Sequence, residues 1–507
     1  MIRKTMTENG AVEGIEAADP RITAFKGIPF AAPPVGENRW RAPKPCPKWE
    51  GTRRAYRFAP ISVQDTPGVG TDIYCREWHV DPDIAMDEDC LYLNVWTGAK
   101  SIEDKQPVLV WFFGGALQWG YPAEMEFDGE RIARRGVVVV TVNYRLNVFG
   151  FLAHPQLTAE QPDEPTNFGN LDQQAGLKWV IRNIRAFGGD PENITIAGQS
   201  AGGGSVLTQM TCPANFGLFQ KAIVESAMIH SPYDVFSIVK PRSLKEAEEL
   251  GVKFFEYIGV NSLEEARKLD AFHLLKLYSK FAGGIPLMLT SMDGKFCVGH
   301  PLELIMQNKY ARVPLMSGNT IDEFPNAITA NSDEEFIKKA KEHFGDRAEE
   351  FLKFEEAWKK EGNQYAKVSG LECTIKSLFR HIQEDEKAPN TYYYRFGTEI
   401  PGWDNPGNFH SVDLWFFFET LAKCWRPFKG RDYDLARQMC NYWCNFIKNG
   451  DPNGKDNDGT DLPYWGPYTN NKPCGMFFST EGAVSEEKEA TEFEKFIMDT
   501  ITEDLLK

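Results

Sequence analysis

The sequence predicts an α/β protein with a large, mostly parallel central sheet, helices on both faces and a helical cap. Near-continuous apolar runs suit strands that are buried on both faces of a parallel sheet. Helical patterns lie between these runs, as in βαβ units. The chain has 507 residues, of which 42% are hydrophobic, so a sizeable core can form.

The predicted strands are short runs rich in β-branched and aromatic residues. They are PVLVWFF (107–113), VVVVTVNY (137–144), NITIAG (193–198), KAIVES (221–226), VPLMSG (313–318) and TYYYRF (391–396). The stretch 170–187 repeats apolar residues at helical spacing, which predicts a helix.

Two later segments have a different, more charged helical pattern. We expect 240–310 and 325–390 to form helices over the sheet, as cap or regulatory-like subregions of one catalytic domain spanning 1–507. The acidic C-terminal stretch from 485 to 507 predicts a docked amphipathic helix.

The charge balance excludes several classes of partner. A net charge of −16 argues against nucleic acid and against an anionic membrane surface, both of which need clustered cations. No apolar run approaches the roughly 18 residues of a membrane span. This charge is compatible with a small-molecule ligand, and it leaves the oligomeric state open.

The N-terminal stretch MIRKTMTENGAVEG starts basic but has no apolar core, which predicts no signal peptide and a cytoplasmic location. Removal of a signal from the chain would leave the same pattern, so secretion is the alternative. The ten cysteines include no CxxC pair, and we expect most of them to be reduced.

The most informative motif is GQSAG at 198–202. A sharp turn from strand to helix would expose the Ser200 hydroxyl, and the small residues Gly198 and Gly202 would give it room. The helix beginning near Ala201 would aim backbone N–H groups at the same point. A glycine-rich turn around a buried serine is the alternative.

A second small-residue loop, FGGA at 113–116, follows a predicted strand. Together with the Ala201 N–H it can form an oxyanion hole. A tight strand-to-helix turn is the alternative.

A nucleophilic serine needs a base and an acid that orients the base. Asp322 and Glu323 follow the strand at 313–318, and His410 lies in a Gly/Pro/Asn-rich loop after the last predicted strand. The chain order Ser, acid, His is that of α/β-hydrolases.

Several motifs together make the chain similar to the type-B carboxylesterase family, which includes cholinesterases and bacterial p-nitrobenzyl esterases. In order, they are FKGIPFAAPPVGENRWRAPKP (25–45), DEDCLYLNVW (87–96), VWFFGGALQWG (110–120), VNYRLNVFGFL (142–152), the stretch 167–203, GNTIDEF (318–324) and GNFHSVDLW (407–415).

This resemblance implies an α/β-hydrolase fold and assigns roles to individual residues. Ser200 would be the nucleophile, His410 the base, and Glu323 rather than Asp322 the acid. The implied oxyanion donors are Gly115, Ala116 and Ala201. No metal or organic cofactor is implied.

Further positions match the family in a supporting role. The resemblance implies that Ser226 lies near the acid, that Arg39 pairs with Glu88 and Arg145 with Asp172, and that Cys75 and Cys90 occupy positions bridged in many secreted members. Without a signal peptide we expect these two to be thiols.

The chain also departs from the family pattern. The differences are Phe113 and Ala116 in the oxyanion loop, Gln199 before the serine, Phe324 after the acid and Asp413 after the histidine. None of them removes a triad atom, but they bear on substrate preference.

The resulting hypothesis is a serine carboxylesterase that acts on small to medium acyl or aryl esters through an acyl-enzyme. The candidate pocket residues are Leu117, Trp119, Met228, Trp415 and Phe416. A feruloyl or cinnamoyl esterase and an amidase on the same triad are the alternatives among enzymes. A non-catalytic, cholinesterase-like binding module is the alternative from another class.

Overall fold

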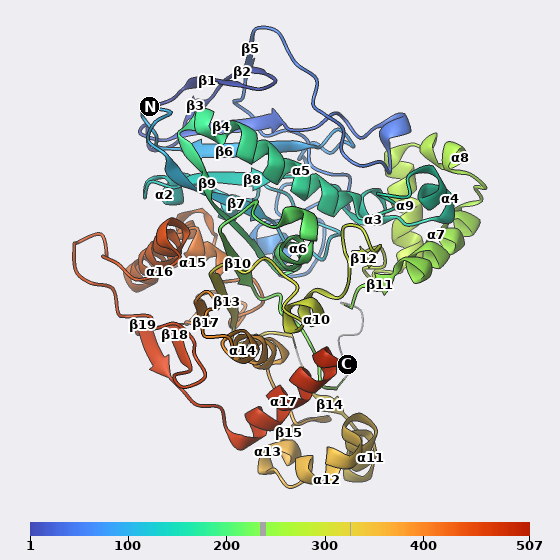
Figure 1. Ribbon diagram of the computed structural model, residues 1–507, viewed down its shortest axis with the longest axis vertical. Helices are drawn as coiled ribbons and strands as arrows, with labels where there is room; N and C mark the ends of the chain where they lie inside the picture. Colours follow the sequence, from blue (N-terminus) through green and yellow to red (C-terminus); the bar gives the residue numbers. More distant parts are fainter. Residues whose placement is uncertain (234–239, 325) are drawn as a thin grey trace.

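The computed structural model describes residues 1–233, 240–324 and 326–507. Within them, an eleven-stranded sheet has the strand order β19-β18-β17-β13-β10-β9-β7-β8-β6-β4-β3 (Figure 1). Its strands are β3 (Ile15–Glu16), β4 (Thr23–Pro29), β6 (Tyr92–Thr97), β7 (Gln106–Phe112), β8 (Val138–Val142), β9 (Gly189–Gln199), β10 (Lys221–Glu225), β13 (Leu315–Thr320), β17 (Thr391–Gly397), β18 (Cys474–Ser479) and β19 (Gly482–Glu487).

The middle of this sheet is parallel, from β8 through β7, β9, β10, β13 and β17 to β18. The pairings at both edges are antiparallel. All six strands predicted from apolar runs are confirmed, and all belong to the parallel part. Every residue of β8, β10 and β13 is buried, which explains the apolar runs 138–140, 222–224 and 315–316 within them.

Helices cover both faces of the sheet (Figure 1). One layer contains α5 (Phe168–Asn183), α6 (Ala201–Thr211), α14 (Gly370–Ile382) and α17 (Glu492–Leu506), and the other contains α15 (Leu414–Phe417) and α16 (Gly430–Asn449). Alternate residues of β7 enter the two cores, with Leu109 and Trp111 on the α16 side and Val108 and Val110 on the α6 side. The predicted helix at 170–187 is α5 followed by a 3₁₀ turn, and the predicted C-terminal helix is α17.

The segment 240–310 is largely helical. It contains β11 (Arg242–Ser243), α7 (Leu244–Ile258), α8 (Leu263–Arg267), α9 (Ala271–Ala282), β12 (Ser291–Met292) and α10 (Pro301–Met306). Helices α7, α8 and α9 gather beside α3 (Asn147–Phe151) and α4 (Pro155–Glu160) at one side of the molecule (Figure 1).

The segment 325–390 begins at a residue outside the described ones. It contains α11 (Asp333–Phe344), α12 (Ala348–Phe351), α13 (Glu355–Trp358), α14 and a small sheet of β14 (Ile328–Thr329), β16 (Gln364–Tyr365) and β15 (Lys360–Glu361). Its α14 packs on β13 and β17, so this helix belongs to the layer on the main sheet.

The N-terminal elements complete the fold. They are β1 (Lys4–Thr7), β2 (Gly10–Glu13) and β5 (Thr52–Arg54), which form a separate three-stranded sheet, and the short helices α1 (Tyr74–Glu77) and α2 (Glu130–Ala133).

Candidate active site

Ser200 sits at the sharp turn between β9 and α6, as the GQSAG motif predicts. Its backbone has φ 55° and ψ −127°, a combination that costs energy for a residue with a side chain. Glycine is required at both flanking positions, because neighbouring backbone atoms lie too close for a Cβ. A Cβ on Gly198 would lie 2.5 Å from Gly202, and a Cβ on Gly202 would lie 2.1 Å from the Phe112 carbonyl oxygen. The turn therefore tolerates a side chain at Ser200 but not at the two glycines.

His410 and Glu323 come from loops that follow two neighbouring strands, β17 and β13. Glu323 Oε2 lies 2.7 Å from His410 Nδ1, and both side chains are almost fully buried. Asp322 has a different task, because its Oδ2 accepts a hydrogen bond from the Asn408 backbone N–H at 2.8 Å. Asp322 thus ties the acid loop to the histidine loop, while Glu323 contacts the imidazole.

The environment of Glu323 favours its ionised form. Burial by itself would raise the pKa of this carboxyl, but the His410 charge and hydrogen bond, with help from Ser226 and Thr320, hold the pKa below its usual value. Glu323 Oε1 accepts hydrogen bonds from Thr320 N–H and Oγ1 at 3.2 and 3.1 Å. Ser226 is fully buried and has a positive φ of 47°.

The other ring nitrogen of His410 faces Gln199, which precedes the serine. Gln199 Nε2 lies 3.2 Å from His410 Nε2. Since the amide nitrogen can only donate, this contact fits an imidazole with its Nδ1 proton toward Glu323 and a lone pair at Nε2. Ser200 and His410 line the same cavity, so the hydroxyl and the ring share one space.

The predicted oxyanion loop lies beside the serine. Gly115, Ala116 and Ser200 line one cavity, and Ala116, Ser200 and Ala201 line the next. Ala116 has a positive φ of 54°. In the described part of the chain, the Gly115 and Ala116 N–H groups donate to no backbone carbonyl, and Ala201 is the first residue of α6, where N–H groups lack intrahelical partners.

Asp413 lies behind the triad in the protein interior. Burial and the Glu323 charge raise the pKa of Asp413 to about 7. Its Oδ2 accepts a hydrogen bond from Tyr394 at 3.0 Å, and its Oδ1 has no partner among the described residues. Burial and the Asp413 charge likewise raise the pKa of Glu225 well above its usual value. The surroundings of Asp413 and Glu225 therefore favour the neutral form of each carboxyl.

Two buried ion pairs implied by the family resemblance are confirmed. Arg39 Nη2 lies 2.6 Å from Glu88 Oε2, and Arg145 Nη2 lies 2.7 Å from Asp172 Oδ1. Neither pair lines a cavity with Ser200. Cys75 and Cys90 are free thiols in the structure, and Cys75 Sγ lies 3.3 Å from Asp72 Oδ2.

Two cavities meet at Ser200. We call the first the α6 cavity; it measures about 330 Å³ and is lined by one side of α6 and by residues 116–117, 240–242, 289–290 and 300–302. The second, the His410 cavity, measures about 480 Å³ and is lined by residues 64–67, 74–75, 78–79, 114–116 and 410–411. Phe324 lines both, and its ring centroid lies 4.6 Å from that of His410. Phe324 thus divides the space on the two sides of the serine.

The candidate pocket residues divide into two groups. Leu117 lines the α6 cavity, and Trp119 lines the His410 cavity, where its Nε1 donates to Asp65 at 3.2 Å. The prediction is wrong for Met228, Trp415 and Phe416, which are fully buried and line neither cavity.

Side-chain direction explains the error. Ala227 and Ile229 line the α6 cavity, so the side chain between them, that of Met228, turns into the core. Trp415 packs behind Trp78, which is itself part of the wall of the His410 cavity. Phe113 is also core, stacked on Tyr144 with 4.2 Å between ring centroids.

Sequence reasoning missed the far walls of both cavities. Lys240, Arg242 and His300 line the α6 cavity, and Asp72 and Tyr74 line the His410 cavity. No local motif marks these residues, because each comes from a segment far from GQSAG in the chain.

The carboxylesterase family model matches residues 3–496, almost the entire chain. The chain belongs to the carboxylesterase family. It is 31% identical to the fumonisin B1 esterase of Sphingopyxis macrogoltabida over 485 residues, which cover 88% of this chain and 82% of that protein. It is 30% identical to the para-nitrobenzyl esterase of Bacillus subtilis over 512 residues, covering 96% and 97% of the two chains.

A solved carboxylesterase of Geobacillus stearothermophilus superposes with a TM-score of 0.76 and 29% identity, covering 98% of this chain and 99% of that one. The fold is therefore that of the α/β-hydrolases, as predicted. This carboxylesterase is a carboxylic ester hydrolase and acts on small-molecule esters. Among its described residues, no helix is both long and apolar enough to cross a bilayer.

Proposed function

We propose that this carboxylesterase hydrolyses small to medium acyl or aryl esters through a Ser200–His410–Glu323 acyl-enzyme mechanism. The observation that carries the proposal is the 2.7 Å contact between His410 Nδ1 and Glu323, with Ser200 at a strained turn in the same cavity. The Glu323 contact orients the imidazole as a general base requires, and the shared cavity gives the Ser200 hydroxyl access to that base, which supports the proposal.

The reaction proceeds in two steps. His410 Nε2 takes the Ser200 proton as Oγ attacks the ester carbonyl, and Glu323 stabilises the imidazolium that forms. The backbone N–H groups of Gly115, Ala116 and Ala201 hold the oxyanion, and one such donor typically contributes about 3–4 kcal/mol. The alcohol departs with the proton from His410, and water then hydrolyses the acyl-enzyme by the same route.

Gln199 influences the protonation of His410, because its side-chain amide lies against the imidazole Nε2. Its amide N–H stabilises the neutral ring but opposes protonation at Nε2, so the amide has to rotate as the imidazolium forms. The rotated side chain presents its carbonyl oxygen, which can accept from the protonated ring. Gln199 is therefore a positioning residue for the base.

The position of His410 assigns the two cavities to the two halves of an ester. The leaving oxygen must lie within reach of His410 Nε2 to take its proton. The alcohol group therefore occupies the His410 cavity, and the acyl group occupies the α6 cavity. The aromatic side chains Tyr74, Trp78 and Trp119 then lie on the alcohol side, which favours aryl alcohols over cinnamoyl acyl groups.

The test is the hydrolysis of p-nitrophenyl acetate, butyrate and octanoate beside methyl ferulate. We expect a burst of p-nitrophenol with the first three esters, an acyl adduct on the peptide that contains Ser200, and slow turnover of methyl ferulate. A folded protein that is inert on every ester would contradict the proposal and favour the amidase or the binding module. The single catalytic domain and the cytoplasmic location stay predictions, and a feruloyl or cinnamoyl esterase stays an alternative that the methyl ferulate assay tests.

A further inference from the structure

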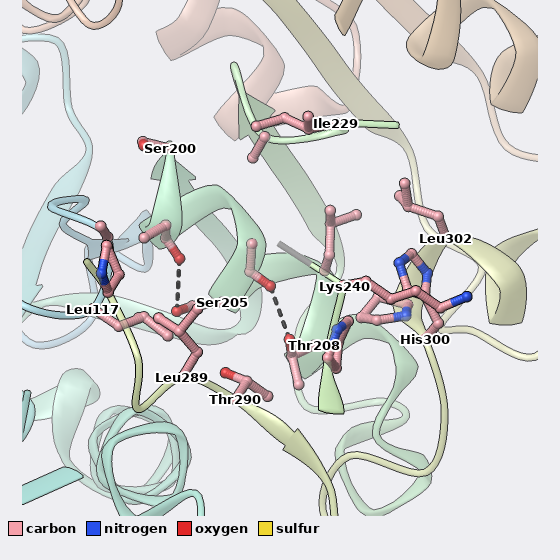
Figure 2. A pocket seen from close by; sticks show the side chains of 18 of the residues that line it. Leu117, Ser200, Ser205, Thr208, Ile229, Lys240, Leu289, Thr290, His300 and Leu302 are labelled. Carbon is pink, nitrogen blue, oxygen red and sulfur yellow. Dashed lines mark hydrogen bonds between the residues drawn. The ribbon is translucent and has the colours of Figure 1, made fainter. Parts of the chain in front are cut away.

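The α6 cavity is lined by cations without acids. Its described lining contains Lys240, Arg242 and His300 but no Asp or Glu, although the chain has 72 acidic and 56 basic residues. Figure 2 shows Ser200 at one side of this cavity and Lys240 and His300 at the opposite side. A ligand attached to Ser200 therefore extends toward positive charge.

The space between the serine and the cations is apolar. Leu117, Ile229 and Leu289 surround it in Figure 2, and Pro286 and Leu207 add to the same lining. The hydroxyls of Ser205 and Thr208 donate to carbonyl oxygens of their own helix, at 3.0 and 2.9 Å. These contacts leave a hydrophobic passage that suits a methylene chain.

His300 adds a buried polar group at the far end. His300 is only 8% exposed, and its Nδ1 has no hydrogen-bond partner among the described residues. Burial, with the nearby Lys240 charge, lowers the pKa of His300 to about 4. The ring is therefore neutral at pH 7 and can donate one hydrogen bond to an anion.

The present partners of the two cations leave room for a ligand. Lys240 Nζ lies 3.5 Å from Glu303 Oε1, and the two side chains are 63% and 33% exposed. Ion pairs with this exposure contribute only about 0–1 kcal/mol, so Lys240 can exchange Glu303 for another carboxylate. Arg242 Nη1 donates to the Leu287 carbonyl oxygen at 2.6 Å, which uses one of five guanidinium N–H groups.

We propose that the α6 cavity selects acyl groups with a terminal carboxylate, so that the preferred substrates are half-esters of dicarboxylic acids. The carboxylate pairs with Lys240 and Arg242 and accepts a hydrogen bond from His300, while the methylene chain lies in the apolar passage. This inference rests on the proposed function of Ser200. Hydrolysis consumes one water, breaks the ester bond and releases the alcohol and a dicarboxylate.

The test compares two probes with the same six-carbon acyl chain. One is the mono-p-nitrophenyl ester of hexanedioic acid, and the other is its methyl-capped, neutral counterpart. We expect the wild-type protein to favour the anionic probe by about tenfold in kcat/KM, as charge-assisted hydrogen bonds to a carboxylate predict. This preference should shrink as the salt concentration rises.

Variants separate local recognition from overall charge. We expect the double substitution Lys240→Gln with Arg242→Gln to bring the ratio of kcat/KM values for the anionic and neutral probes to about one, because the anionic probe loses both of its cationic partners. Lys245→Gln on α7 lies outside the cavity, removes one charge and should leave the ratio unchanged. Glu303→Gln frees Lys240 and should raise the ratio.

The outcomes distinguish the two proposals. A wild-type protein that hydrolyses neither probe contradicts the function proposed for Ser200. A protein that hydrolyses both probes equally, or whose preference survives the double substitution, overturns the inference about the acyl group. A preference that falls equally in the Lys245→Gln variant also overturns it, because overall charge would then be the cause.

Discussion

The two cavities that meet at Ser200 differ in the sign of their charges. Lys240 and Arg242 are the charged residues in the described lining of the α6 cavity. The described lining of the His410 cavity contains the acidic residues Asp65, Asp72, Glu124 and Glu126 and neither Lys nor Arg. Glu124 has a partner of its own, since it lies 3.0 Å from His79. Partial burial would raise the pKa of the Asp72 carboxyl, but hydrogen bonds, led by those from Cys75, outweigh this effect and lower the pKa, so this exposed residue is ionised at pH 7.

If Ser200 is the nucleophile, as we propose, this difference would let it serve an asymmetric substrate. Charge attracts its opposite over several ångströms even where no direct contact forms. Under our assignment, an ester with an anionic acyl end and a cationic alcohol end fits the two cavities in only one direction. The reverse orientation would place like charges together and carry the leaving oxygen away from His410.

The largest effect is expected from replacing Ser200, which lines both cavities. We expect Ser200→Ala to lower kcat/KM by at least about 10⁴-fold for anionic, neutral and cationic esters alike. Initial rates on all three classes, with a thermal melt as the folding control, measure this. Activity that persists on one class alone would mean that a second nucleophile serves one cavity.

A slightly smaller effect comes from the acid. We expect Glu323→Gln to lower kcat by about 10³–10⁴-fold, equally for all ester classes, because His410 loses its orienting carboxylate. Asp322→Asn is the matched control, since Asp322 contacts the Asn408 backbone rather than the imidazole. A larger loss in the Asp322 variant than in the Glu323 variant would reverse the assignment of the acid.

A moderate and selective effect is expected in the His410 cavity. Asp72→Asn should lower kcat/KM for a quaternary-ammonium alcohol ester by about 3–10-fold relative to p-nitrophenyl butyrate, because one attractive charge is lost. Asp81→Asn makes the same change in net charge outside the cavity and should leave this ratio alone. An equal fall in both variants would show long-range steering instead of a charged wall.

The smallest effect on activity is expected for a substitution of Asp413, because Asp413 lines neither cavity. Its effect should appear in the stability of the protein instead. The pKa of Asp413 is raised from 3.8 to about 7, so the folded protein holds a proton that the unfolded chain releases. Stability contributed by this group therefore falls as the pH rises from about 4 to 7.

Asp413→Asn keeps a neutral side chain and should remove that loss. We expect the variant to gain about 1–3 kcal/mol at pH 8 relative to pH 5.5, compared with wild type. Urea unfolding at the two pH values measures the difference. A wild-type protein whose stability follows the same pH dependence as the variant would show that Asp413 stays ionised.

Much of the fold and the centre of the site could be predicted from sequence. The strands 107–113, 137–144 and 193–198 are visible in the sequence because parallel strands are largely buried on both faces and are therefore rich in apolar residues. GQSAG was visible because its turn admits only glycine at 198 and 202. Such features depend on neighbours in the chain.

The walls of the cavities could not be predicted in the same way. Met228 is core although Ala227 and Ile229 line the α6 cavity, because the chain makes a tight turn here, with the Ile229 N–H donating to the Ala227 carbonyl oxygen, and the middle side chain points away from its two neighbours. Trp415 and Phe416 are core for a similar reason, since successive helical residues point about 100° apart while Leu414 lines the His410 cavity.

The sequence by itself therefore determined the strands of the sheet and the glycine-flanked turn at Ser200, which follow from local spacing and steric limits, whereas the proposed roles of serine, acid and histidine came from the resemblance to the family. The structure agrees with the choice of Glu323 over Asp322 that the family resemblance implied, but only the tertiary structure decided that Lys240 and His300 lie across a cavity from Ser200. These relations join segments far apart in the chain, and their geometry is set by the packing of the whole sheet and its helices.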